Sequence, residues 1–479
     1  MHKSATQLFK NTVVIAAAEV VSKIMTFVFF IFTARVLGVN AFGDFSYTLA
    51  LMMVVSIVSD FGASSFLVKV SAQDSERAKD FSVATLFRMF VTLLANIVVL
   101  VYLHISHASQ EVITLAMCMG GGMLLSCYGQ NIGFVFRGRN KVAIDGFIRL
   151  LHPFLASLTG VLALKLGYGL TGVGVTYLIA FAATSAAAFA INLRFGLAKF
   201  TFSLSWTDYQ HVIRESLPYF IWAGLSIIYA KFDTILLQHV RGPQDVGVFS
   251  AALRVTEIVT ALPAIIFMAV LPVLSSAIAK KDMETAAFIS HFTLKYMTYL
   301  GMFITCCIFL TADFAINTLY NSSEYAGAIL PLRVLIISSA ISYIYIIPLT
   351  LFFIAAPPRV ISWYSLVTPT LLVGLDLVII PIWGFVGASA VRVVTEIVGL
   401  IMLSTYVNRT ILKLAYRDFL LPAAVASLVT GVSILMARSF LLVPAYLAIY
   451  VSALFICKGF SKDEFSKIRT MVSSSFTNW

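Results

Sequence analysis

The sequence predicts an all-α polytopic membrane protein with about 14 transmembrane helices. Hydrophobic residues make up 60% of the 479-residue chain and charged residues only 11%, whereas a soluble globular protein carries roughly 25% charged residues. The apolar residues form unbroken runs long enough to cross a bilayer as helices, without the alternation of barrel strands. The net charge of +11 comes from short basic clusters between these runs. That distribution indicates membrane topology, and we expect membrane lipid rather than nucleic acid as a partner.

Fourteen apolar segments are expected to span the membrane. They cover residues 11–36, 42–68, 81–104, 111–136, 143–166, 170–193, 213–239, 246–278, 286–311, 326–354, 360–380, 385–407, 417–437 and 440–457. The basic residues of the connections lie at both termini and in the even-numbered gaps, and the odd-numbered gaps contain little beyond Arg241 and Arg438. By the positive-inside rule, both termini are predicted to be cytoplasmic.

The chain contains an internal repeat. Five residues share a constant offset of 204: Gly38, Gly43, Phe45, Ser46 and Leu49 match Gly242, Gly247, Phe249, Ser250 and Leu253. A weaker match relates Gly169 and Gly172 to Gly384 and Gly387 at an offset of 215. Each repeat contains six spans, so both enter the membrane from the same side, and a pseudo-two-fold axis along the membrane normal should relate them.

The repeat suggests four parts of the chain. They are an N-terminal six-helix lobe (1–194), a cytoplasmic interfacial linker (195–212), a C-terminal six-helix lobe (213–411), and helices 13 and 14 with a cytoplasmic tail (412–479). A cleft between two such lobes can open to either side in turn, so transport is a better expectation than catalysis. No nucleotide-binding G-x-x-x-x-G-K-[ST] motif, paired-carboxylate site, catalytic triad or metal motif is found, and we expect no cofactor and no catalytic residue.

Charged residues at bilayer depth are costly and normally face the interior of the helix bundle. Six of them are the candidates for contacting a substrate in the cavity: Lys23, Arg88, Lys231, Asp233, Arg254 and Arg333. Six others are candidates for H⁺ or Na⁺ coupling or for structural pairing: Glu19, Asp60, Glu257, Asp376, Arg392 and Glu396. Cations in a cleft would select an anionic substrate.

Helical spacing allows some of these charges to neutralise each other. Glu19 and Lys23, Arg254 and Glu257, and Arg392 and Glu396 are three or four residues apart, so each pair can meet on one helix face. Arg88, Lys231 and Arg333 have no such local partner, nor do Asp60, Asp233 and Asp376. Pairing between helices is the alternative for these, and Arg149 can reach the membrane interface with its long side chain.

Ordered motifs in both halves resemble a known family. They are Ala34-Arg35-Val36-Leu37-Gly38 with Gly43 and Phe45, then Ser216-Leu217-Pro218, Asp233, and the run from Gly247 to Arg254. Together with fourteen spans, this order is similar to bacterial polysaccharide repeat-unit flippases of the O-antigen type, in the multidrug/oligosaccharidyl-lipid/polysaccharide exporter superfamily. Phe249 stands where tyrosine is frequent, and the acidic Asp44 after Gly43 is a local departure.

The resemblance implies a function and a location. A flippase of this kind moves an undecaprenyl-pyrophosphate-linked oligosaccharide from the cytoplasmic to the periplasmic leaflet of the inner membrane during O-antigen and lipopolysaccharide biosynthesis. A polysaccharide polymerase and a chain-length regulator are the implied protein partners. Three alternatives remain open: a flippase for the peptidoglycan lipid precursor, a multidrug exporter of the same superfamily, and a membrane glycan polymerase or ligase.

Overall fold

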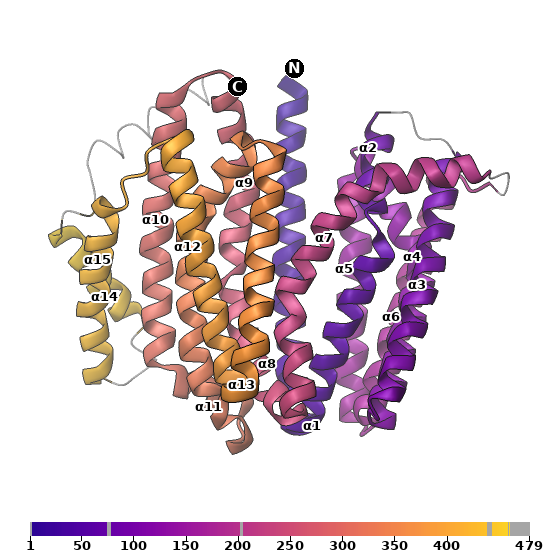
Figure 1. Cartoon of the computed structure of the whole chain (residues 1–479), viewed down its shortest axis with the longest axis horizontal. Coiled ribbons are helices and arrows are strands. Elements are labelled where there is room, and N and C mark those ends of the chain that lie inside the picture. The colour runs from indigo at the N-terminus through magenta and orange to yellow at the C-terminus, as the bar shows by residue number, and fades with distance from the viewer. Residues whose placement is uncertain (1, 74–77, 202–204, 438–442, 458, 460–479) are drawn as a thin grey trace. The chain divides into compact units, whose positions relative to one another are not determined.

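The computed structural model describes all residues except 1, 74–77, 202–204, 438–442, 458 and 460–479, and the side chains of 1–19, 78, 218, 221–223, 436–437 and 443 also lie outside the description. In the described part, all regular elements are helical (Figure 1). They are α1 (His2–Asp60), α2 (Ala63–Ala72), α3 (Ala78–Ile105), α4 (Gln110–Gly138), α5 (Val142–Lys165), α6 (Gly169–Phe195), α7 (Trp206–Arg241), α8 (Pro243–Val259), α9 (Ala261–Ala279), α10 (Met283–Leu310), α11 (Ala312–Tyr320), the 3₁₀ helix η1 (Ser323–Ala328), α12 (Ile329–Ala355), α13 (Pro358–Thr410), α14 (Arg417–Ala437) and α15 (Val443–Ile456).

The predicted all-α membrane fold is confirmed. Among the described residues, ten helical stretches are long and apolar enough to cross a membrane. Two of them, α1 and α13, are each broken at a glycine and contain two predicted spans, while α7 and α15 match the two predicted spans outside these ten. The helices therefore agree with about fourteen crossings. Large apolar side chains such as Phe90, Val98 and Ile105 of α3 are exposed, as expected where lipid is the solvent.

The chain divides into two compact units. Unit 1 comprises residues 1–8, 251–364 and 386–479, and unit 2 comprises residues 9–250 and 365–385. The boundaries of these two units differ from those of the two halves of the repeat. The lobe boundaries inferred from the sequence stay a prediction.

Each unit has its own apolar core. In unit 2, α4 packs on α3, α5 and α6, and the four helices run side by side (Figure 1). Phe81, Phe136 and Ile148 are buried among them. In unit 1, α10 packs on α12 and α14, and Leu294 and Phe352 belong to the core of that unit.

The repeat is visible in the backbone. Gly38 has φ 77° and ψ 174°, and Gly242 at the equivalent position has φ 86° and ψ −176°. Gly169 and Gly384 likewise have φ 57° and 55°. L-residues with a side chain rarely adopt such positive φ values. Glycine is therefore needed at each of these two turns in both halves of the repeat.

The two halves of the repeat also touch each other within unit 2. A Cβ atom built on Gly43 would lie 1.8 Å from the Pro243 carbonyl oxygen, and one built on Gly247 would lie 2.1 Å from the Val39 oxygen. Val39 and Pro243 are equivalent in the repeat, as are Gly43 and Gly247, so the contact is reciprocal. This self-complementary arrangement is typical of a two-fold axis.

The segment predicted as an interfacial linker, 195–212, is partly helical. Helix α7 begins at Trp206, whereas the seventh predicted span begins at residue 213. Ser205 and Asp208 form a capping box at its first turn, and hydrogen bonds from the Ser205 side chain and backbone lower the pKa of Asp208. Lys79 lies 3.3 Å from the Asp208 carboxylate, which connects the starts of α3 and α7.

Candidate functional site

A cavity of about 510 Å³ lies in unit 2 and is called the larger cavity here. Its lining residues come from α1, α2, α3, α4, α5 and α7: Ser56, Ile57, Asp60, Ser64, Ser65, Val68, Lys69, Arg88, Gln130, Phe134, Arg137, Arg149 and Tyr219. Four of these residues are cationic, Lys69, Arg88, Arg137 and Arg149, and one, Asp60, is a carboxylate. The surface of the larger cavity therefore carries an excess of positive charge.

Arg88 is the buried cation of this cavity, with 4% of its surface exposed. Ten residues separate it from the start of α3, or about 15 Å along the helix axis at 1.5 Å per residue. Its guanidinium donates to Asn131 Oδ1 at 2.8 Å and to Gln130 Oε1 at 2.6 Å, and lies 3.5 Å from Asp60 Oδ1. Two neutral acceptors and one carboxylate thus hold a charge that could not otherwise be buried at this depth.

The Arg88 guanidinium has five N–H donors, and its hydrogen bonds to Asn131 and Gln130 do not use all of them. Its Nε is buried and has no hydrogen-bond partner among the described residues. The Asp60 carboxylate is shared, because Oδ2 accepts from Ser64 at 2.6 Å. An incoming anion can therefore interact with Arg88 without first breaking an ideal bidentate ion pair.

Two guanidinium groups lie beside one aromatic ring. The guanidinium carbons of Arg88 and Arg137 are each 5.7 Å from the centroid of the Phe134 ring. Arg137 also pairs with Asp145 at 2.6 Å, and Arg149 lies 3.6 Å from the same carboxylate. Two arginines therefore share one carboxylate at this edge of the cavity.

Lys69 marks the end of the cavity on α2. It donates to Glu215 of α7 at 3.0 Å, and both side chains are substantially exposed. This hydrogen bond raises the pKa of the Lys69 ammonium, and a lysine is positively charged at neutral pH even without such a shift. An exposed pair of this kind contributes little to stability, so Lys69 can exchange its partner.

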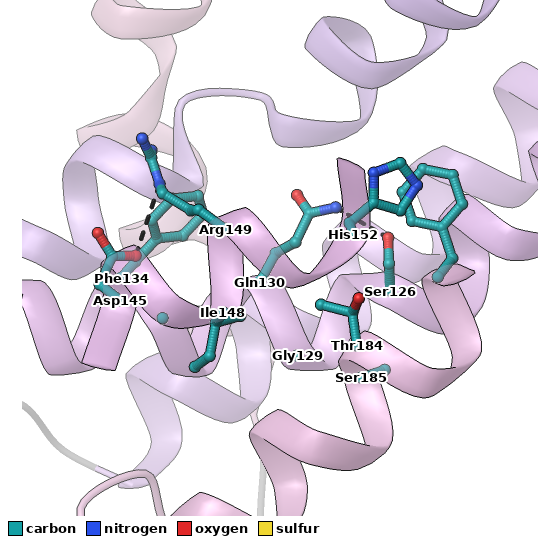
Figure 2. Close-up of a pocket in the computed structure, with 12 residues that line it drawn as sticks. Ser126, Gly129, Gln130, Phe134, Asp145, Ile148, Arg149, His152, Thr184 and Ser185 are labelled. Atoms are coloured by element: carbon teal, nitrogen blue, oxygen red, sulfur yellow. Dashed lines mark hydrogen bonds and ion pairs between the residues drawn. The ribbon is translucent and has the colours of Figure 1, made fainter. Parts of the chain in front are cut away.

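Figure 2 shows a second cavity of about 210 Å³, called the smaller cavity here. It is lined by Ser126, Gly129, Gln130, Gly133, Phe134, Asp145, Ile148, Arg149, His152, Phe181, Thr184 and Ser185. Gln130, Phe134 and Arg149 line both cavities. Figure 2 shows Phe134, Asp145 and Arg149 at one end, His152, Ser126 and Thr184 at the other, and Gln130 between them.

The substrate-contacting residues predicted from the sequence are distributed over both units. Arg88 lines the larger cavity. Lys23 of α1 is exposed, and Lys231 and Asp233 of α7 are buried within unit 2. The Asp233 carboxylate accepts from the backbone N–H of Thr234 at 2.6 Å. Their role in binding stays a prediction.

The other two predicted contacts lie in unit 1. Arg254 forms an ion pair with Glu257 at 2.6 Å, which is the pairing that their i, i+3 spacing indicated. Arg333, near the start of α12, donates to the Phe309 carbonyl oxygen at the end of α10 at 3.2 Å. Its position is therefore close to the end of a helix rather than at mid-span.

The candidates for coupling or pairing have different surroundings. Asp60 of α1 pairs with Arg88 of α3, which is the pairing between helices expected for charges without a local partner. Asp376 is buried in unit 2, and Arg392 interacts electrostatically with Glu396 in unit 1. The side chain of Glu19 lies outside the described residues, so its pairing with Lys23 stays a prediction.

Among the charged and amide residues of the larger cavity, four lie outside the site residues predicted from the sequence: Lys69, Gln130, Arg137 and Arg149. The sequence places Lys69 and Arg137 in connections between the predicted spans and Arg149 near the membrane interface, and the neutral Gln130 gives no indication of a site. The i, i+4 spacing of Asp145 and Arg149 was a usable indication that Arg149 is held within the bundle.

Comparison with known proteins identifies the family. Residues 8–278 match the family described as polysaccharide biosynthesis protein, which is more than half of the chain, and residues 218–368 match the family MatE. No curated protein gives a match.

Solved structures show the same fold at low sequence identity. A structure described as lipid II flippase MurJ in an inward closed conformation is 16% identical, has a TM-score of 0.76, and covers 93% of this chain and 97% of its own. An inward-facing multidrug resistance MATE family transporter of the MOP superfamily is 15% identical, with a TM-score of 0.63 and coverage of 81% and 95%. A MOP superfamily transporter from Pyrococcus furiosus, whose title reports reverse polarity of the binding pocket, has a TM-score of 0.54 at 15% identity, with coverage of 84% and 95%. The chain is thus a multi-pass membrane protein that belongs to the polysaccharide biosynthesis protein family, with the fold of the multidrug/oligosaccharidyl-lipid/polysaccharide exporter superfamily.

Proposed function

We propose that this protein flips an undecaprenyl-pyrophosphate-linked oligosaccharide repeat unit from the cytoplasmic to the periplasmic leaflet by alternating access. The observation that carries the proposal is the larger cavity, where four cations and one carboxylate line about 510 Å³. A pyrophosphate carries negative charge and several acceptor oxygens, which match guanidinium and ammonium donors. Membership of a polysaccharide biosynthesis family supports a glycan as the rest of the headgroup.

The physical problem is the transfer of a polar headgroup through hydrocarbon. Moving hydroxyl and charged groups into an apolar medium without replacement hydrogen bonds costs several kcal/mol per group. The polar lining of the larger cavity supplies such replacements: Lys69, Arg88 and Arg137 for the phosphates and serine hydroxyls for the sugars. The polyprenyl chain stays in lipid, where it has no such cost.

The expected orientation agrees with loading from the cytoplasm. Lys69 lies in the last turn of α2 and Arg137 in the last turn of α4, next to connections that the positive-inside rule places in the cytoplasm. The larger cavity is then on the cytoplasmic side of the inner membrane, where the lipid-linked repeat unit is assembled. O-antigen and lipopolysaccharide synthesis, with a polymerase and a chain-length regulator as partners, is the setting in which such a unit is used.

Deletion of the gene in the native host tests this function. We expect loss of surface polysaccharide and accumulation of complete, carrier-linked repeat units, measured by lipid extraction and mass spectrometry. Accumulation of complete units separates a flippase from a polymerase, since a polymerase mutant still displays single units at the surface. Normal surface glycan in the deletion strain would contradict the proposal.

A peptidoglycan-precursor flippase is the second candidate, favoured by the TM-score of 0.76 to the lipid II flippase structure. Growth of the deletion strain separates the two candidates. Loss of a flippase for the peptidoglycan precursor would stop wall synthesis, whereas loss of a repeat-unit flippase leaves the wall intact.

For coupling to H⁺ or Na⁺ we propose Asp60 as the carboxylate to examine, because it lies in the larger cavity beside Arg88. A translocation rate indifferent to both gradients would reject that coupling.

A further inference from the structure

The smaller cavity contains buried polar atoms that the surrounding helices do not satisfy. Nε2 of His152 and Oγ1 of Thr184 are both buried and have no hydrogen-bond partner among the described residues. Thr184 as a whole is only 6% exposed. An unsatisfied buried polar group is costly, because it has lost its hydrogen bonds to water without a replacement. Two such groups at one end of the same cavity (Figure 2) indicate a place where a polar ligand completes the hydrogen bonds.

Aromatic rings form part of the same wall. The His152 ring stacks on Phe181 with centroids 3.9 Å apart and an interplanar angle of 28°, and Phe134 lines the opposite end. The cavity therefore combines apolar ring faces with hydroxyl, amide, imidazole and carboxylate groups. A phosphate would use only the donors, whereas a sugar ring presents an apolar face together with hydroxyls that both donate and accept.

The volume limits the ligand to something small. At about 30 Å³ per liquid water, the 210 Å³ of the smaller cavity correspond to about seven waters. That space accommodates one sugar ring but not an oligosaccharide. At this wall Gly129 allows α4 to approach α6 closely, because a Cβ atom at Gly129 would lie 2.8 Å from Ser185 Cα.

Gln130 connects the two cavities through one oriented amide. Its Oε1 accepts from Arg88 in the larger cavity at 2.6 Å, and its Nε2 donates to Ser126 Oγ in the smaller cavity at 2.8 Å. Because Arg88 can only donate, this contact fixes which end of the amide faces each cavity. An anion held by Arg88 therefore lies next to Gln130, which lines both cavities.

We propose that the smaller cavity binds a single sugar ring of the headgroup, next to the pyrophosphate held in the larger cavity. Thr184 and His152 hydrogen-bond the sugar hydroxyls, and Phe181, at the same end of the cavity, contacts its apolar face. Asp145, which is held by Arg137 and Arg149, adds an acceptor at the other end. This inference rests on the proposed function, and it assigns recognition of the sugar to α4, α5 and α6.

The test measures binding of two lipids to the full chain in lipid nanodiscs. The probes are undecaprenyl pyrophosphate and the same carrier bearing one sugar, isolated from the native host. We expect the wild type to bind the glycosylated carrier about tenfold more tightly. Thr184→Val and His152→Phe keep the shape of their side chains and remove the polar atoms. They should bring the ratio close to one without weakening binding of the bare carrier.

Two matched variants control for general damage. Thr176→Val makes the same change at another buried threonine of α6, whose hydroxyl donates to the Val173 carbonyl oxygen. Thr176 lines neither of the two cavities, so this variant should keep the tenfold ratio. Thr184→Ser retains the hydroxyl and should do the same. Equal binding of both lipids by the wild type, or an unchanged ratio in Thr184→Val and His152→Phe, would overturn the sugar site while leaving the flippase proposal intact. Failure of the wild type to bind either lipid would contradict the proposed function and the sugar site together.

Discussion

Arg88→Gln will reduce surface polysaccharide at least tenfold when it replaces the wild type in the native host. The substitution removes the buried cation of the larger cavity and leaves Asp60 without its ion-pair partner. Breaking a buried pair by removing one partner costs about 3–5 kcal/mol. Part of the loss will therefore come from lower stability. Surface glycan is measured per unit of membrane-inserted protein, which separates transport from abundance.

The double variant Asp60→Asn with Arg88→Gln distinguishes a structural role from a substrate-binding role. Removing both charges also removes the uncompensated carboxylate, so protein abundance and thermal stability should recover towards wild type. Transport should not recover, because the cation is still absent, and Asp60→Asn alone measures how much of the loss comes from removing the proposed coupling carboxylate. Lys165→Gln removes an exposed cation from the last turn of α5 and should leave both readouts unchanged. Full surface polysaccharide in either Arg88 variant would exclude Arg88 from the binding site.

Gly43→Ala and Gly247→Ala will each prevent the reciprocal contact between the two halves of the repeat. The added methyl carbon would lie 1.8 Å from the Pro243 oxygen or 2.1 Å from the Val39 oxygen, so the helix backbones must move apart. Overpacking of this kind costs about 1–3 kcal/mol, and more where the obstacle is backbone. We expect a loss of monodisperse protein after detergent extraction and a lower Tm in both variants.

Gly146→Ala is the matched control for these substitutions. A Cβ atom at Gly146 of α5 meets nothing within 4 Å, and alanine favours a helix over glycine by about 0.5–1 kcal/mol. This variant should be as stable as the wild type or slightly more stable. If Gly43→Ala and Gly247→Ala were as stable as Gly146→Ala, the close reciprocal contact would be wrong.

The fold was largely predictable because it depends on patterns that local sequence carries. Apolar runs of sufficient length predicted the helices, and the offset of 204 residues predicted that Gly38 and Gly242 are equivalent positions of a repeat. The structure gives these two glycines similar backbone angles. The i, i+3 spacing of Arg254 and Glu257 predicted an ion pair that is present. Each of these features involves residues close together on one helix or a repeat of one motif.

The cavity was less predictable because it depends on contacts between helices. Arg88 was predicted from its depth, but its acceptors Gln130 and Asn131 lie 42 and 43 residues away on α4, and spacing along the chain does not indicate such pairing. The contact of Arg137 with Asp145 likewise arises only when α4 and α5 pack together, whereas Arg149 reaches the same carboxylate from four residues away on α5, a spacing that the sequence does show. The sequence also gave no sign that His152 and Thr184 face one cavity.

Translocation by the purified protein in proteoliposomes tests the central claim most directly. The vesicles contain undecaprenyl-pyrophosphate-linked repeat units from the native host, and an externally added glycosidase reports how fast the headgroups reach the outer leaflet. The account predicts protein-dependent translocation that Arg88→Gln abolishes and Lys165→Gln preserves. Translocation no faster than in protein-free vesicles, or equal rates in the wild type and Arg88→Gln, would contradict it.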